Sequence, residues 1–398
     1  NFLQYAVWGA WLISLGAYLG NTLKFDGLQI GSFFATMGIA SLFMPAVMGI
    51  IADRWIPAQR LLGLCHLFAA GFITLAATRT DYNSLYTLVL LSVMFYMPTI
   101  ALSNSVAYNA LEKAGLDTVT HFPPIRVWGT VGFICAMWVV DLGKMGLSAT
   151  QLYFSATLGL ILGLYSFTLP NCPINRSGGG KSIVDLLGLR AFALFKQRKM
   201  AIFFIFSMLL GMSLQITNAF ADGYIKSFGD TGIHGAKYLG TFGVEHSTIL
   251  ISLSQISETL CILLIPFFLK RFGIKRVMLI AMFAWVLRFA LLGAGNPGPG
   301  VWMFILSMIV YGVAFDFFNI SGSLFVEKET SAAIRSSAQG VFMIMTNGLG
   351  ALIGSYLAGW VVNHYGWPLS WYLFAGFSLV VAIVFAVIFK YKHDPNRI

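Results

Sequence analysis

Charged residues are scarce in this chain. Asp, Glu, Lys and Arg together make up 10% of the 398 residues, whereas a soluble globular chain carries about 25%. The longest polar stretch, residues 170–199, is too short to fold as a domain by itself. The composition therefore argues against a soluble catalytic or signalling domain.

The charge that is present is mostly basic, and the net charge is +10. The basic residues cluster between hydrophobic runs instead of forming the continuous patch that nucleic-acid binding requires. That distribution is typical of the cytoplasmic loops of membrane proteins. We therefore expect a lipid bilayer, and no nucleic acid, as a partner.

Cysteine is rare and catalytic motifs are missing. The four cysteines form no CxxC pair and most fall in apolar runs, which favours reduced packing residues over disulfides. No HExxH, GxSxG or Cys/His cluster occurs, so we expect no metal, no cofactor and no enzyme. The stretch GGGKS at 178–182 lacks the glycine that a phosphate-binding loop needs at Asn175, and no strand precedes it. The cysteines are Cys65, Cys135, Cys172 and Cys261.

Long hydrophobic runs are what the sequence has in abundance. Hydrophobic residues make up 58% of the chain, and mean hydropathy is +0.79. The runs are about 20 residues long, the length with which an α-helix crosses a bilayer, and the alternation of barrel strands is absent. The sequence predicts about twelve transmembrane helices. Their expected limits are 2–21, 28–52, 61–78, 84–109, 124–141, 148–169, 200–225, 246–268, 274–294, 301–325, 334–362 and 369–389.

The expected helices divide into two halves of six. Residues 1–169 and 200–398 each form a six-helix bundle, and 170–199 form a cytoplasmic linker. Within the linker, SIVDLLGLRAFALFKQRK has the pattern of an amphipathic helix lying on the membrane surface. Lys and Arg are concentrated in alternate loops, which predicts that both termini are cytoplasmic. The sequence begins Asn-Phe-Leu-Gln, so we expect that N-terminal residues precede it and that no cleavable signal peptide is present.

A short basic loop recurs at the same place in each half, between its second and third helices. The first half has GIIADRWIPAQR, with Gly49, Asp53 and Arg54, and the second has PFFLKRFGIKR, with Gly273. The pair resembles the Gly-x-x-x-Asp-Arg signature of the major facilitator superfamily, intact in the first half and degraded in the second. The alternative is that both loops are basic only because they face the cytoplasm. The resemblance implies the major facilitator fold, with two six-helix bundles around a central cavity.

Polar side chains inside hydrophobic runs carry the functional argument, because charge in hydrocarbon is costly. Gln255 and Glu258 are three residues apart, so they share one helical face. Glu258 either lines a cavity, where it binds substrate or a proton, or is a structural partner of Arg288. Gln215 and Asn218 repeat the three-residue spacing in the preceding helix. Amides both donate and accept hydrogen bonds, which suits a nucleobase edge or a sugar.

Two further helices carry candidates. Arg126, Thr130 and Phe133 follow one another at i, i+4 and i+7, so they share one face of a helix, although Arg126 alone would also suit an interfacial anchor. Tyr311 and Phe315 share a face that offers rings for stacking. On the flank beside them lie Asp316 and Asn319. A carboxyl group in apolar surroundings binds a proton more readily, so Glu258 and Asp316 are the proton-coupling candidates.

Longer motifs carry a more specific resemblance. QYAVWGAWL, FPPIRVWGT, QITN, SQISETL and FDFFNISGSLFVEKE closely resemble the bacterial nucleoside:proton symporter family of the major facilitator superfamily. The resemblance implies a monomeric importer of the bacterial cytoplasmic (inner) membrane that couples uptake of purine and pyrimidine nucleosides to protons. It implies that Asp316 is a nearby functional acid. It assigns nucleoside binding to Arg126, Thr130, Phe133, Gln215, Asn218, Gln255, Glu258, Tyr311 and Phe315.

Several alternatives stay open at this stage. A sugar or oligosaccharide symporter would also use aromatic and amide contacts, and an intramembrane enzyme or receptor is a more remote alternative. Members of the resembled family differ in preferred nucleoside, xanthosine being one example. The outer loop 229–245 and the linker depart from the family's pattern, which leaves substrate range open.

Overall fold

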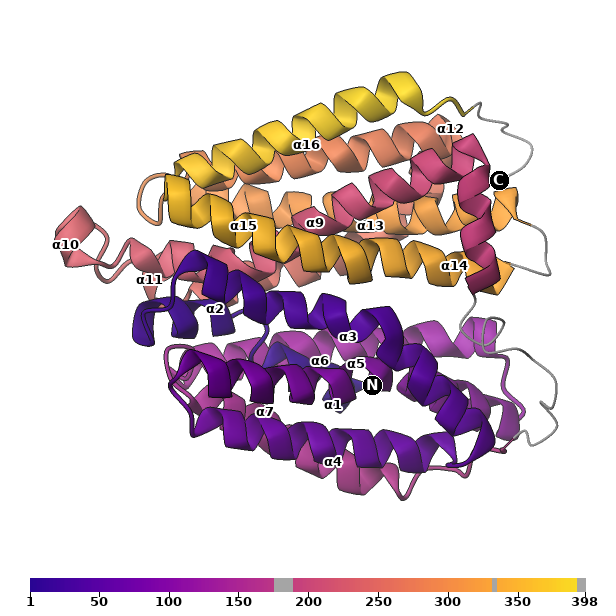
Figure 1. Ribbon diagram of the computed structural model, residues 1–398. Coiled ribbons are helices and arrows are strands. Elements are labelled where there is room, and N and C mark those ends of the chain that lie inside the picture. Colours follow the sequence, from indigo (N-terminus) through magenta and orange to yellow (C-terminus); the bar gives the residue numbers. More distant parts are fainter. Residues whose placement is uncertain (175–188, 331–334, 392–398) are drawn as a thin grey trace. The chain divides into compact units, whose positions relative to one another are not determined.

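The structure is a computed structural model that describes residues 1–174, 189–330 and 335–391 (Figure 1). Within these residues all regular secondary structure is helical, and no strand occurs. The predicted all-α class is therefore confirmed. The chain forms two compact units, one of Asn1–Phe25 with Ser32–Leu187 and the other of Asp26–Gly31 with Gly188–Ile398. We call them unit 1 and unit 2.

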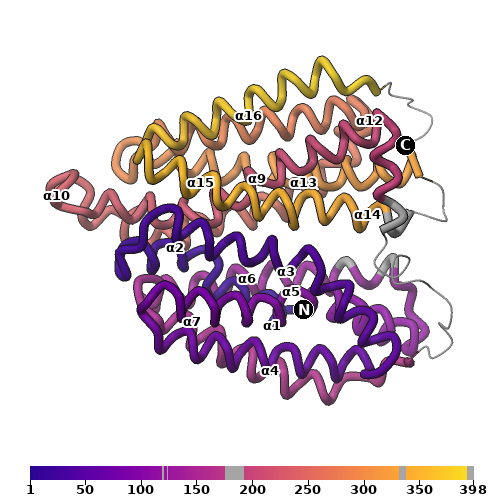
Figure 2. The backbone as a smooth tube through the Cα atoms, viewed as in Figure 1, coloured from indigo at the N-terminus to yellow at the C-terminus, as the bar shows by residue number. Residues whose placement is uncertain are grey.

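Unit 1 contains the first six predicted spans. The first span is interrupted and comprises three short helices, after which long helices follow. In the fold, α4 packs along both α5 and α7, while α1 packs against α6 and α7 (Figure 2). The elements are α1 (Phe2–Gly9), α2 (Leu15–Ala17), the π-helix η1 (Tyr18–Thr22), α3 (Gly27–Arg54), α4 (Ala58–Ala77), α5 (Tyr82–Lys113), α6 (Thr118–Leu142) and α7 (Thr150–Ser166).

Unit 2 contains the remaining spans. Here α12 packs against α13 and α16, and α9 packs against η3 and α15. Two very short helices, α10 and α11, follow α9 and precede α12 in the chain (Figure 1). The elements are the 3₁₀-helix η2 (Leu189–Lys196), α9 (Arg198–Ser227), α10 (Thr231–His234), α11 (Phe242–Glu245), α12 (Ser247–Ala294), α13 (Val301–Glu329), α14 (Arg335–Met343), the π-helix η3 (Ile344–Gly350), α15 (Ala351–Tyr365) and α16 (Leu369–Ile388).

The twelve predicted spans all correspond to helical segments. Nine helices in the described part of the chain are long and apolar enough to cross a membrane. One of them, α12, covers two predicted spans because the helix reverses at Gly273, where φ is 75° and ψ is 166°. Only glycine adopts that conformation without strain. The remaining two spans are the interrupted segment Phe2–Thr22 and the short helix α7.

The predicted linker is only partly described. Its residues 175–188, which include GGGKS and the start of the proposed amphipathic helix, lie outside the described residues. The part that follows, Leu189–Lys196, is a 3₁₀-helix. Polar loops also supply helix caps. The Asp81 carboxylate accepts a hydrogen bond from the Ser84 backbone N–H at 2.9 Å at the start of α5, and this bond lowers the pKa of Asp81.

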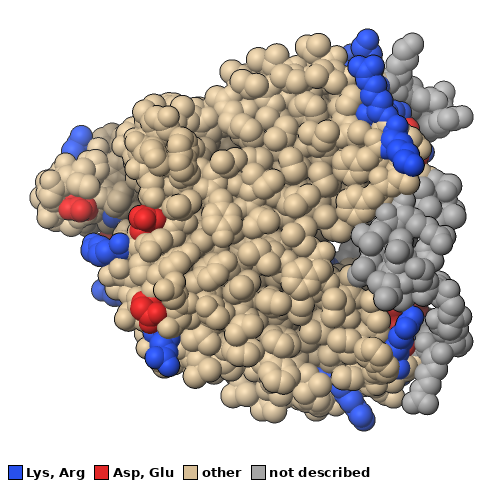
Figure 3. All heavy atoms as spheres, in the orientation of Figure 1, with Lys and Arg blue, Asp and Glu red and all other residues tan. Residues whose placement is uncertain are grey.

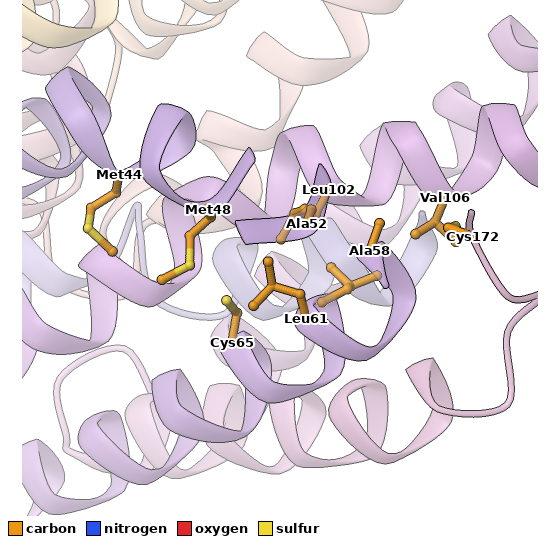
Figure 4. Close-up of a cluster of buried hydrophobic side chains, with 10 residues drawn as sticks. Met44, Met48, Ala52, Ala58, Leu61, Cys65, Leu102, Val106 and Cys172 are labelled. Carbon is orange, nitrogen blue, oxygen red and sulfur yellow. The ribbon is translucent and has the colours of Figure 1, made fainter. Parts of the chain in front are cut away.

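A hydrophobic cluster in unit 1 joins the end of α3 to α4 and α5 (Figure 4). Met44, Met48 and Ala52 approach from α3 and meet Leu61 and other small or aliphatic side chains. Two of the four cysteines belong to this cluster, and all four are free thiols, as predicted. The expectation that they serve in packing holds for the three that are buried, Cys65, Cys172 and Cys261, but Cys135 is exposed.

The surface matches a helical membrane protein. On the face drawn in Figure 3, charged side chains lie near the ends of the helices, and the surface along the helices shows none. Large apolar side chains are exposed in number on the described residues, including Leu263, which is 74% exposed, and Val387, which is 71% exposed. Water would not favour such a surface, whereas lipid chains solvate it well.

Candidate substrate and proton sites

The unit 1 candidates lie on α6 and meet α1. The guanidinium of Arg126 lies over the ring of Tyr5, with its carbon 4.0 Å from the ring centre. The ring of Phe133, which is 8% exposed, presents its edge to Trp8 at 6.3 Å between centroids. Thr130, which lies between Arg126 and Phe133 in the sequence, is half-buried. Arg126 and Phe133 are therefore both placed by aromatic side chains of α1, which the sequence analysis did not identify.

A buried polar network fixes α1 in unit 1. The Gln4 amide donates to Thr99 Oγ1 at 2.7 Å, and its oxygen accepts from His66 Nε2 at 2.7 Å. The Tyr96 hydroxyl donates to the Gln4 backbone oxygen at 2.7 Å. Gln4 is 1% exposed and His66 is fully buried. Buried polar groups that satisfy one another in this way hold a helix in a single position.

The amide candidates of unit 2 lie on α9 and α12. Gln215 is buried, and the Asn218 amide approaches its oxygen at 3.5 Å, so the predicted common face is confirmed. On α12 the side-chain oxygen of Gln255 is shielded from solvent and accepts no hydrogen bond from the described residues. An acceptor left without a donor in an apolar interior is costly, and a bound ligand that donates to it would remove that cost.

The two candidate rings of unit 2 are stacked. Tyr311 and Phe315 lie with centroids 5.6 Å apart and planes inclined by only 5°, which confirms that they share a face of α13. The Arg288 guanidinium lies 4.8 Å from the centre of the Tyr311 ring. Its Nη1 donates to the Ser307 backbone oxygen at 2.7 Å. Arg288 thus fixes Tyr311 from the second half of α12.

The two acids of unit 2 are neighbours. Asp316 is 4% exposed, and its Oδ2 has no hydrogen-bond partner among the described residues. Glu258 is close enough to act on it electrostatically. Asn319, on the same flank, donates to the Phe315 backbone oxygen at 2.9 Å. Two acid side chains that interact electrostatically within a membrane bundle are candidates for binding the coupled proton.

A pocket with an empty space of about 290 Å³, including its open mouth, adjoins these residues within unit 2. Phe315 and Asn319 of α13 line it together with Leu214 of α9 and Trp285 of α12. Asn347 lines it from the π-helix η3, and the sequence analysis did not single out this residue. Short π-helical segments are frequent at functional sites, and the only sequence signal here is the polar pair Thr346–Asn347 in an apolar span.

A buried ion pair in unit 2 was also missed. Lys226 Nζ lies 2.6 Å from Asp222 Oδ2, one helical turn away on α9. The other carboxylate oxygen accepts from Ser247 Oγ at 2.6 Å and from Thr248 Oγ1 at 3.1 Å. These hydroxyls belong to the first turn of α12, where a carboxylate also interacts favourably with the helix dipole. The pair therefore ties the two helices that carry the amides.

The candidates thus lie on one helix of unit 1 and on three helices of unit 2. Within unit 1, α6 presents Arg126, Thr130 and Phe133. Within unit 2, α9, α12 and α13 present the amides, the acids and the rings. No group of three or more His, Cys, Asp or Glu side chains that could hold a metal ion occurs among the described residues. A helical membrane bundle with buried amides, acids and rings is the architecture of a membrane transporter for a small polar solute.

Comparisons with known proteins specify the family. Residues 1–394 match the Nucleoside H⁺ symporter family. The chain is 51% identical to the nucleoside permease NupG of Escherichia coli over 99% of this chain and 95% of that one. It is 50% identical to the xanthosine permease of the same organism over 100% and 96% of the two chains. The crystal structure of the nucleoside transporter NupG superposes with a TM-score of 0.91, covering 98% of this chain and 97% of that one, at 51% identity.

The chain therefore belongs to the Nucleoside H⁺ symporter family. It is a multi-pass membrane protein with the major facilitator fold, it transports nucleosides together with protons, and it is not an enzyme. This confirms the predicted fold and function, and it decides against the sugar symporter, the intramembrane enzyme and the receptor.

Proposed function

We propose that the polar and aromatic groups of unit 2 bind the nucleoside. The stacked rings of Tyr311 and Phe315 offer one flat apolar surface to the base, because 5.6 Å between centroids leaves no room for a base between them. Stacking of a base on an aromatic side chain contributes about 1–3 kcal/mol and tolerates different bases. This parallel pair is the observation that carries the proposal.

The amides and Glu258 supply the polar half of the proposed contacts. Gln215, Asn218 and Gln255 can donate to and accept from base edges and ribose hydroxyls. The unpartnered oxygen of Gln255 supports this role most directly, because a ligand donor would satisfy it. Glu258, three residues along α12, accepts from ribose hydroxyls. In unit 1, Arg126, Thr130 and Phe133 contribute further nucleoside contacts from α6.

The neighbouring acids carry the proton in this proposal. Asp316 is buried with one oxygen unpartnered, and Glu258 is half-buried on the adjoining helix. Because Glu258 belongs to the nucleoside-binding face as well, loss or gain of its proton changes the hydrogen bonds available to the ribose. Proton binding and nucleoside binding are thereby linked through one side chain. Asp316 serves as the second acid of the pair.

The substrate range proposed is broad and includes purine and pyrimidine nucleosides. Relatives of about 50% identity are named as a nucleoside permease and as a xanthosine permease. Stacking on Tyr311 and Phe315 reads only the flat face of a base, and amides accommodate either polarity at its edge. We further propose that the protein acts as a monomer in the bacterial inner membrane with both termini cytoplasmic, as the distribution of Lys and Arg predicts.

A transport panel tests this proposal. The purified protein is reconstituted in proteoliposomes, and uptake of labelled uridine is measured with an inward proton gradient in the presence of excess unlabelled competitors. Adenosine, cytidine and xanthosine should each reduce uridine uptake, and free ribose and lactose should not. Competition by ribose alone at the same concentration would contradict the role given to the rings. Inhibition by a single nucleoside only would contradict the broad range.

A further inference from the structure

The contact between Tyr5 and Arg126 defines which part of Arg126 is available to a ligand. The guanidinium carbon lies 4.0 Å from the centre of the Tyr5 ring, so the ring covers one side of the guanidinium. Tyr5 itself is 7% exposed. The five N–H donors of a guanidinium point outward in its plane. With one side covered by Tyr5, Arg126 can engage a ligand through the N–H donors along its edge, by hydrogen bonds.

Gly129 leaves space for the contact between Tyr5 and Arg126. A Cβ atom at Gly129 would lie 2.5 Å from Tyr5 Cδ2 and 3.0 Å from Arg126 Nη1. No side chain larger than hydrogen fits there without displacing the ring or the guanidinium. Gly129 lies three residues after Arg126 on α6, so the gap is directly beside the Arg126 side chain. The glycine is therefore needed for the stacked geometry.

The preceding residue, Gln4, holds the backbone of α1 in place beside the Tyr5 ring. Gln4 is held through its amide by Thr99 and His66 and through its backbone oxygen by Tyr96. These partners belong to α4 and α5, so α1 is attached to two other helices at the residue next to Tyr5. A fixed ring holds the guanidinium in one orientation and removes the rotamer entropy that a long side chain would otherwise lose on binding.

We infer that Tyr5 is a positioning residue for nucleoside binding: it holds Arg126 so that the edge of the guanidinium donates to acceptor oxygens of the nucleoside. The inference rests on the proposed function, in which Arg126 contacts the substrate. It adds a residue of α1 that does not itself touch the nucleoside. It also predicts that Tyr5 acts only through Arg126.

A double-mutant cycle in proteoliposomes tests this. The kinetics of uridine uptake are compared for the wild type, Tyr5→Leu, Arg126→Gln and the double variant. Tyr5→Leu should raise KM roughly tenfold with little change in maximal rate, as expected for a desolvated cation–π contact. Tyr5→Phe, which keeps the ring, should restore wild-type KM. In the Arg126→Gln background Tyr5→Leu should have no further effect.

Two further variants complete the design. Gly129→Ala should raise KM as Tyr5→Leu does, and it tests the geometry if Tyr5→Leu fails to fold. Tyr165→Leu, at a tyrosine that is 55% exposed in the same unit, is the control and should behave as the wild type. An unchanged KM in both Tyr5→Leu and Gly129→Ala, with KM raised in Arg126→Gln, would overturn the inference alone. The inference would also be overturned if Tyr5→Leu raised KM equally in the wild-type and the Arg126→Gln backgrounds. An unchanged KM in Arg126→Gln would overturn the proposed contact of Arg126 with the nucleoside and this inference with it.

Discussion

The rings of Tyr311 and Phe315 lie parallel, with 5° between their planes and 5.6 Å between their centroids. Arg288 rests against Tyr311 from α12 at 4.8 Å, and Phe315 lines the pocket of unit 2. One ring is thus fixed from behind, and the other borders open space. The pair provides a rigid apolar surface near the acids Glu258 and Asp316.

The stacked rings should contribute to nucleoside affinity. Phe315→Leu should raise the Kd for uridine by roughly tenfold, because stacking on an aromatic side chain contributes about 1–3 kcal/mol per base. Isothermal titration of the purified protein in detergent measures this. Phe283→Leu, at a phenylalanine of α12 that is 48% exposed, is the matched control and should bind as the wild type does. Equal affinities for all three proteins would remove Phe315 from the site.

Asn347 should act as an additional polar contact. It lines the same pocket as Phe315, and among the described residues its amide makes a weak contact of 3.8 Å to Met343 Sδ. Replacement by alanine should raise KM for uridine by about three- to tenfold, because one hydrogen bond contributes a net free energy of about 0.5–1.5 kcal/mol. Uptake by Asn83→Ala, at an exposed asparagine of unit 1, should be unchanged. A wild-type KM in Asn347→Ala would mean that η3 has no part in binding.

The ion pair of Asp222 and Lys226 on α9 should stabilise the folded protein. Asp222→Ala leaves Lys226 partly buried without its carboxylate and also removes the acceptor of Ser247 and Thr248. Loss of one partner of a buried pair costs about 3–5 kcal/mol, so thermal unfolding in detergent should occur at a clearly lower temperature. Adding Lys226→Met should recover part of the loss. If the single variant unfolds at the wild-type temperature, the pair does not stabilise the link between α9 and α12.

Much of the fold follows from hydrophobic run length, because a helix must satisfy its own backbone within a bilayer. That constraint places all twelve spans near their observed positions. Helical spacing likewise predicts shared faces, as for Tyr311 with Phe315 and for Gln215 with Asn218. Both kinds of prediction depend on residues that are close together in the sequence.

What the sequence does not reveal depends on contacts between distant residues or on backbone details. Tyr5 lies 121 positions before Arg126, and no periodicity links them. The π-helix around Asn347 shifts the facing of that segment, so an ideal helical wheel misplaces it. Asp222 and Lys226 fall at the polar end of a span, where charges are expected in any case. The break near Gly273 follows from the basic loop between the spans 246–268 and 274–294, but the backbone conformation of Gly273 does not.

We expect the acid pair Glu258 and Asp316 to couple proton entry to nucleoside transport. Proton movement measured directly tests it best: uridine is added to proteoliposomes in a weakly buffered medium, and the external pH is recorded. The wild type should make the medium more alkaline as protons enter with uridine. Glu258→Gln should abolish this change while uridine counterflow, which needs no net proton movement, continues. If Glu258→Gln still moves protons with uridine, the coupling proton belongs to Asp316, and the same result in Asp316→Asn as well would contradict the role of the pair.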